Sequence, residues 1–232
     1  MLGPADYVLW LLTAVLEAGV VVCALKRHSF RRFLALNIYM LVSLVVTILR
    51  FWVFSYYGFR SAQYLYFYFY SDALLTVGLY FALITLYSFV LSELQTERYV
   101  RLAAIVLLAG TAFFSYQVIQ QSSDRMLTRF VVELSQNLYF VGLVLTYLLW
   151  GAILKLRETR AQIIHMVLSL GLYFSAFAAT YALRNLYPGL HLVWGHLPQV
   201  IALSLPLAWA YTIWRIPVEA RLAPARLAVV SR

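Results

Sequence analysis

The chain has 232 residues, of which 64% are hydrophobic and 12% are charged. Soluble globular proteins contain roughly half apolar residues and about a quarter charged ones, so this composition excludes a soluble fold and predicts a single membrane domain. The formal net charge is +9, but the basic residues recur at the ends of apolar runs. This distribution excludes a nucleic-acid-binding stripe.

Seven apolar runs are each close to the length of about 20 residues that a helix needs to cross a bilayer. Because the runs are continuously apolar and do not alternate, they predict helices and not the strands of a barrel. The sequence therefore predicts an all-α integral membrane protein, a bundle of seven transmembrane helices formed by residues 1–214. The predicted spans are 6–25, 33–56, 64–92, 100–119, 129–154, 161–185 and 195–214, and a short basic tail follows at 215–232.

The positions of Lys and Arg predict the orientation of these spans, because cytoplasmic loops carry an excess of both residues. With the N-terminus outside, 13 of the 18 basic residues fall in inner segments. We therefore expect an outer N-terminus and a cytoplasmic C-terminus, in a bacterial cytoplasmic membrane. Residues 1–25 contain no Lys or Arg, so the first run lacks the basic start of a cleaved signal peptide. The five basic residues on the outer side are Arg50, Arg60, Arg125, Arg129 and Arg184.

The third run carries an acid inside an apolar segment. Six aromatic residues between Tyr64 and Tyr70 open the run, and tyrosine rings favour the headgroup boundary. Asp72 follows inside the run, and Glu17 lies near the middle of the first run. An ionisable side chain inside a span is costly in lipid, so both acids are expected to face other helices or a wet cavity.

Further polar residues lie at comparable depth in other runs. Arg50 ends a stripe of polar residues at helical spacing in the second run, and Glu133 and Asn137 lie one turn apart in the fifth. At a rise of about 1.5 Å per residue, the charged members of the set fall in the outer half of the membrane or at its midplane. We therefore predict a cavity that opens outward. Its candidate ligand-binding or proton-relay residues are Glu17, Arg50, Asp72, Glu133, Asn137 and Arg184.

A structural interpretation of the same residues stays open. Arg50, Glu133 and Arg184 lie near enough to the outer surface to extend their charged groups to the interface. Glu17 and Asp72 would then be protonated and would form hydrogen bonds between helices.

Several specific chemistries are disfavoured. The sequence contains no HExxH, GxSxG, P-loop or glycine-rich nucleotide motif. The topology resembles that of rhodopsins, but the only lysines are Lys26 and Lys155 at inner helix ends, so the retinal-binding lysine of the last span is absent. A single cysteine, Cys23, allows neither an intrachain disulfide nor a multi-cysteine metal site. We expect no cofactor and no metal, and the sequence favours a non-enzymatic role.

The function that the sequence favours is a sensor or receptor-like protein that signals through a separate membrane or cytoplasmic protein. In topology alone, the chain resembles bacterial heptahelical sensor modules. The alternatives are a proton- or cation-coupled transporter subunit, a non-catalytic structural subunit of a larger membrane complex, and an enzyme that acts on lipids. Expected partners are the lipid bilayer, including anionic lipids at the inner basic loop Lys26–Arg32, and no nucleic acid.

Overall fold

The computed structural model describes residues 4–27, 29–58, 61–92, 97–119, 126–187, 189, 191–217 and 220–221. These residues form seven helices that are long and apolar enough to cross a membrane, which confirms the all-helical prediction. The orientation relative to the membrane stays a prediction, and most of the expected basic tail lies outside the described residues. The helices are α1 (Pro4–Lys26), α2 (Leu34–Tyr57), α3 (Ala62–Val90), α4 (Glu97–Ile119), α5 (Met126–Leu156), α6 (Ala161–Leu186) and α7 (His191–Arg215).

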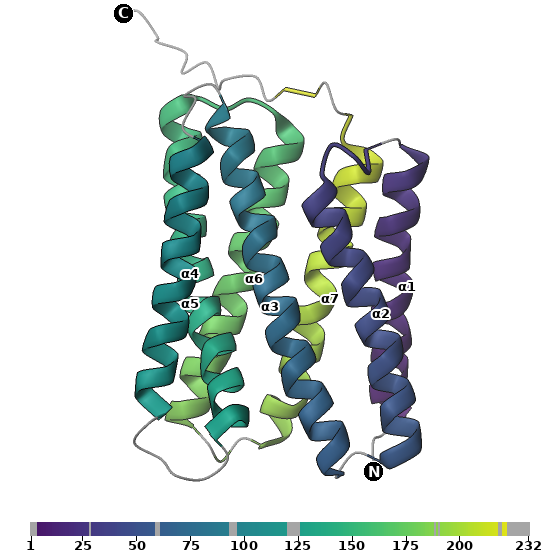
Figure 1. The fold of residues 1–232 in the computed structure, drawn as a ribbon. Helices are drawn as coiled ribbons and strands as arrows, with labels where there is room; N and C mark the ends of the chain where they lie inside the picture. The colour runs from purple at the N-terminus through teal and green to yellow at the C-terminus, as the bar shows by residue number, and fades with distance from the viewer. Residues whose placement is uncertain are drawn as a thin grey trace, which may run out of the picture.

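Six of the helices pack in a closed ring. Each of α1, α2, α3, α5, α6 and α7 contacts the next in that order, and α7 packs back against α1. Helix α3 also contacts α6 across the ring. Helix α4 lies outside the ring against α5 and α3, at the left of the bundle in Figure 1. The interior of the ring is therefore formed without α4.

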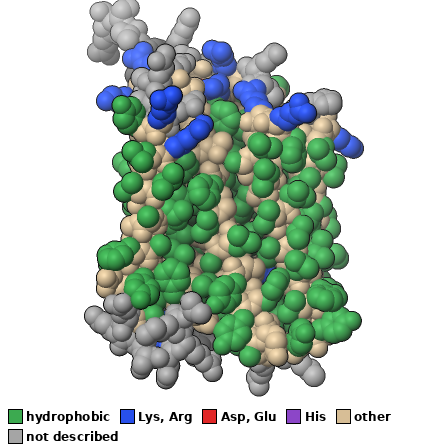
Figure 2. Space-filling model, in the orientation of Figure 1, with side chains coloured by type: hydrophobic (Ala, Val, Ile, Leu, Met, Phe, Trp, Pro, Cys, Tyr) green, Lys and Arg blue, Asp and Glu red, His purple; other side chains and the backbone are tan. Residues whose placement is uncertain are grey.

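The surface divides into an apolar belt and one basic end. Hydrophobic side chains cover the middle of the visible face, while Lys and Arg gather at the end where α1, α3, α5 and α7 finish (Figure 2). We call this end the basic end. An apolar belt over seven long apolar helices indicates an integral membrane protein.

Local sequence signals explain how α2 and α3 are joined and where α7 lacks a backbone hydrogen bond. Gly58 ends α2 with a φ of 78°, a value that glycine adopts without strain. Ser61 then caps α3, because its hydroxyl accepts a hydrogen bond of 3.1 Å from the backbone N–H of Tyr64. Pro206 lies inside α7 and cannot donate a backbone hydrogen bond to Ala202, four residues earlier.

The half of the bundle nearest the basic end is closely packed. Trp209 of α7 is 1% exposed, and its Nε1–H donates to Ser169 Oγ of α6 at 2.9 Å. Near the middle of the bundle, α5 and α6 approach so closely at Gly142 that a Cβ atom there would overlap the ring of Phe174. Other fully buried members of this core are Val20, Ala24, Leu86, Leu149, Ile163, Met166 and Val167.

Candidate functional site

The other half of the bundle contains a cavity of about 370 Å³. All six helices of the ring contribute lining residues, and no described residue of α4 does. The lining runs from the end opposite the basic end, which we call the cavity end, to about the middle of the bundle. Its charged members are Glu17, Arg50, Asp72 and Arg184, and its aromatic members are Trp10, Tyr39, Tyr64, Tyr68, Phe69, Tyr139, Tyr173, Phe177, Tyr181 and Trp194.

Arg50 of α2 is held against α3 by several contacts. Its Nε donates to Ser71 Oγ at 2.8 Å, and its Nη2 donates to the carbonyl oxygen of Tyr68 at 3.1 Å. The guanidinium carbon also lies 4.4 Å from the centroid of the Tyr68 ring. The Asp72 carboxylate completes the group, with Oδ1 3.9 Å from Nη2. The positive charge of Arg50 is therefore already matched by groups on α3.

Glu17 of α1 lies deeper in the cavity and is only 4% exposed. Its Oε1 accepts a short hydrogen bond from the hydroxyl of Ser43, and Thr47 lies beside the same carboxyl group one turn further along α2. Its Oε2 is buried and has no hydrogen-bond partner within the described residues. Glu17 therefore presents one buried acceptor oxygen that the Ser43 hydroxyl does not satisfy, in a place where an unmatched polar atom is costly.

Other unpartnered polar atoms belong to the same cavity. The Oγ of Ser135 on α5 and the Oε1 of Gln199 on α7 are buried without a partner, and both residues line the cavity. The only other such atom among the described side chains is Gln162 Oε1, near the basic end. Unsatisfied buried polar atoms in a folded protein call for an explanation, and three of these four belong to residues lining one cavity.

Two of the six predicted site residues are not among the lining residues. Asn137 of α5 donates its Nδ2 to Ser115 Oγ of α4 at 2.9 Å, so it joins α4 to the ring. Glu133 is also absent from the lining, although Ser135 and Gln136 are present. A helix turns by about 100° per residue, so neighbours in the sequence face different partners.

The remaining four predicted residues line the same cavity. Arg50 and Asp72 lie together, Glu17 lies deeper, and Arg184 lies near the cavity end of α6 with an exposed side chain. Sequence reasoning missed Ser135 as a cavity residue. Its neighbour Gln136 was the available signal, because the polar face of α5 is displaced by one residue from the expected position.

An aromatic wall stands opposite Glu17 across the ring of helices. The ring of Tyr139 on α5 stacks on that of Phe177 on α6, with centroids 4.7 Å apart and an interplanar angle of 11°. Tyr173 packs against both rings. On α2, Tyr39 contacts Trp209 at 6.0 Å between centroids, which connects the cavity to the packed core.

No family model matches the chain, and no curated protein or solved structure was found to be similar to it. The assignment of function therefore rests on the geometry of the cavity and of the basic end. Among the described residues, no group of three or more His, Cys, Asp or Glu is arranged to hold a metal ion.

Helix α7 extends from the cavity to the basic end. Pro198, Gln199 and Ala202 line the cavity, as do Leu205 and Pro206. Trp209 then enters the packed core, and the helix finishes at Arg215. A change in the shape of the cavity would therefore act on a helix that lacks a backbone hydrogen bond at Pro206, near its middle.

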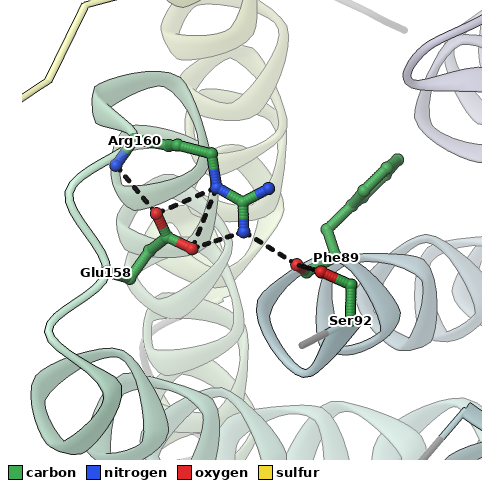
Figure 3. Close-up of polar contacts among 4 residues, drawn as sticks. All are labelled: Phe89, Ser92, Glu158 and Arg160. Atoms are coloured by element: carbon green, nitrogen blue, oxygen red, sulfur yellow. Dashed lines mark hydrogen bonds and ion pairs between the residues drawn. The ribbon is translucent and has the colours of Figure 1, made fainter. Parts of the chain in front are cut away.

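A polar junction ties the helix ends together at the basic end (Figure 3). The side chain of Arg160 donates to both carboxylate oxygens of Glu158, and its Nη2 also donates to the carbonyl oxygen of Phe89 at 2.9 Å. The Ser92 hydroxyl donates to the same carbonyl at 3.0 Å. Partial burial alone would raise the pKa of Glu158, but the hydrogen bonds from Arg160 outweigh it and lower the pKa.

The segment that follows α7 joins this junction. The backbone N–H of Ala161 donates to the carbonyl of Ala220 at 3.0 Å, and Gln162 Nε2 donates to the carbonyl of Ile216 at 2.7 Å. At the end of α1, Arg27 donates to the carbonyl of Trp214 at 2.9 Å and lies 5.3 Å from the centroid of its ring. The end of α7 is thus fastened to both α1 and α6.

Proposed function

We propose that this chain is a heptahelical membrane sensor or receptor that binds a small ligand in the cavity and signals through a separate protein at the basic end. The observation that carries the proposal is the cavity of about 370 Å³, in which three lining residues each keep one buried polar atom without a hydrogen-bond partner among the described residues. Small-molecule sites are concave, largely apolar and provided with a few directed polar groups. The cavity has this character.

The proposal includes an orientation. The cavity end faces outward and the basic end faces the cytoplasm, with the N-terminus outside and the C-terminus inside, in a bacterial cytoplasmic membrane. The concentration of Lys and Arg at one end of the bundle supports this orientation. A reporter protein fused after residue 232, active only in the cytoplasm or only outside it, tests it directly.

The proposed route of the signal is α7. This helix lines the cavity with Gln199 and Pro206 and is fastened at its other end to Arg27 and Gln162. Ligand binding that favours one bend of α7 would change the basic surface that a partner protein contacts. The basic surface also suits anionic lipid headgroups.

Ligand-dependent thermal stability tests the proposal. The full chain, purified in detergent, is screened against small amines, alcohols, carboxylates and amino acids, because a ligand that binds only the folded state raises the melting temperature. The variants are Glu17→Gln and Asp72→Asn, and Glu133→Gln serves as the matched control because Glu133 does not line the cavity. We expect a compound that stabilises the wild type and the control but not the two cavity variants. A panel without any such compound would contradict a ligand-binding role and favour a structural subunit.

A second candidate function is a proton- or cation-coupled transporter subunit. Glu17 supports it, because a buried carboxyl group with one unpartnered oxygen lies in a cavity near the middle of the bundle. Proton flux into vesicles that contain the purified chain distinguishes the two functions. A flux that is present in the wild type and lost in Glu17→Gln would favour transport over sensing.

A further inference from the structure

The arrangement of charges and acceptors in the cavity indicates what kind of ligand it accepts. The charge of Arg50 is already matched by Asp72, Ser71 and the carbonyl of Tyr68. Arg184 has an exposed side chain at the cavity end. The acid deeper in the cavity, Glu17, has no ion-pair partner among the described residues. The deep part of the cavity therefore holds an acid that is not directly paired with a cation among the described residues.

Two unpartnered oxygen atoms of the cavity lining are acceptors. Glu17 Oε2 and Gln199 Oε1 are both buried without a donor, and they belong to α1 and α7, which pack side by side. A carboxylate oxygen and an amide oxygen each accept N–H or O–H donors and cannot donate. A ligand that satisfies both must carry polar hydrogens, and beside a carboxylate the strongest such donor is a cation.

The rest of the lining suits the remaining part of such a ligand. Tyr39 lies close enough to Glu17 for the two side chains to interact electrostatically. The stacked rings of Tyr139 and Phe177 form an apolar wall. Aromatic faces attract ammonium groups and also pack against apolar groups. A cavity of about 370 Å³ has the size of pockets that enclose small organic molecules.

We infer that the cavity binds a small organic cation, a primary or secondary ammonium compound with an aromatic or apolar body, whose N–H groups donate to Glu17 and Gln199. The inference rests on the proposed binding function and names the ligand class of the same site. The ammonium group lies in the deep part of the cavity, and the apolar body packs against the aromatic wall.

Three compounds that share one ring and one chain length test the inference. They are 2-phenylethylamine, which is a cation at neutral pH, 2-phenylethanol, which is neutral, and phenylacetate, which is an anion. Affinities for the full chain in detergent are measured by calorimetry and by the shift in melting temperature. We expect the amine to bind at least tenfold more tightly than the alcohol, and phenylacetate not to bind.

The Glu17→Gln variant supplies the second comparison. Truncating one partner of a buried charge pair costs enough to weaken binding of the amine by about 30-fold or more, with little effect on the alcohol. Glu133→Gln is the matched control and keeps wild-type affinity. If Glu17→Gln does not fold, the comparison of the three compounds on the wild type still decides the inference.

Each remaining outcome overturns the inference in a recognisable way. Equal affinity for the amine and the alcohol would mean that Glu17 does not select a cation. Binding of phenylacetate alone would make the arginines the anchoring groups. If none of the three binds while only neutral or anionic compounds of the wider panel do, the cation assignment fails and the proposed function stands. If nothing in the panel binds, both fail.

Discussion

The two halves of the bundle treat their polar groups differently. Near the basic end, the indole N–H of Trp209 donates to Ser169. The Arg160 side chain donates to both the carboxylate of Glu158 and the backbone carbonyl of Phe89. In the cavity half, Glu17 and Gln199 keep buried oxygen atoms without a protein donor. Three cavity-lining residues keep such an atom, whereas near the basic end Gln162 Oε1 is the one example among the described side chains.

This difference indicates how the fold divides its tasks. A close-packed interior becomes less stable when one of its side chains is made either larger or smaller. Removing an unpartnered polar group from the lining of a cavity should change the stability of the protein little, because that group contributes little to the folded state. Substitutions in the two halves should therefore have opposite profiles, with large effects on stability in one and large effects on binding in the other.

The largest effect on stability is expected for Gly142→Ala. The new methyl group would overlap the ring of Phe174, which is 1% exposed and belongs to the packed core. Overpacking of this kind lowers the free energy of unfolding, by about 3 kcal/mol in the most severe cases. Thermal unfolding in detergent measures it, with Gly151→Ala as the control because a Cβ at Gly151 meets nothing within 4 Å. Equal melting temperatures for the two variants would show that α5 and α6 are not closely packed here.

A smaller loss of stability is expected for Trp209→Phe. The substitution removes the donor to Ser169 Oγ and leaves unfilled volume beside Tyr39, at a combined cost of about 2 kcal/mol. Trp10→Phe is the matched comparison in the cavity half, where the indole donates to the backbone carbonyl of Thr47 at 3.1 Å. We expect the Trp10 variant to lose clearly less stability. A reversed order would contradict the distinction between the halves.

The Glu158–Arg160 pair should make a modest contribution that depends on pH. The pKa of Glu158 is lowered in the folded protein, so the pair stabilises the fold above the ordinary glutamate value of 4.5. That contribution disappears as the pH falls through the lowered pKa. Glu158→Gln should cost about 1 kcal/mol or less at pH 7. The gap in melting temperature between wild type and variant should close in acid, and a gap independent of pH would exclude the ion pair as its cause.

The smallest effect on stability is expected for Glu17→Gln. The amide keeps the shape of the side chain and can still accept from Ser43, while it removes a buried acid that has no cation partner. We expect the change in melting temperature to be smaller than that of Glu158→Gln at pH 7, with ligand binding altered as described above. Unfolding of the variant under native conditions would instead make Glu17 a structural residue.

The seven helices could be predicted from the sequence because a bilayer imposes one simple requirement. A span needs about 20 apolar residues with every backbone group satisfied internally, and hydropathy shows such segments directly. Depth along each helix could also be estimated, which is why Glu17, Arg50, Asp72 and Arg184 could all be expected in the outer half of the membrane or at its midplane. These four residues do line one cavity.

The neighbours of each helix could not be predicted in the same way. Sequence periodicity shows which residues share a face, but it does not show which helix that face meets. Helix α4 lies outside the ring, so α3 packs more extensively against α5 than against α4, its neighbour in the chain. Asn137 consequently faces Ser115 of α4 and not the cavity. The unpartnered atoms of Ser135 and Gln199 depend on the same long-range packing.

The contact between α1 and α7 has a consequence for how the protein is made. These two helices stand at opposite ends of the described helical order, yet they pack side by side and both line the cavity. During synthesis, α1 leaves the ribosome long before α7, the helix that packs against it in the bundle. Ser43 of α2 can pair with Glu17 early, because α2 follows α1 directly in the chain. The α7 side of the cavity, with Gln199, is added only when α7 packs against α1, so we expect the cavity to close late in folding.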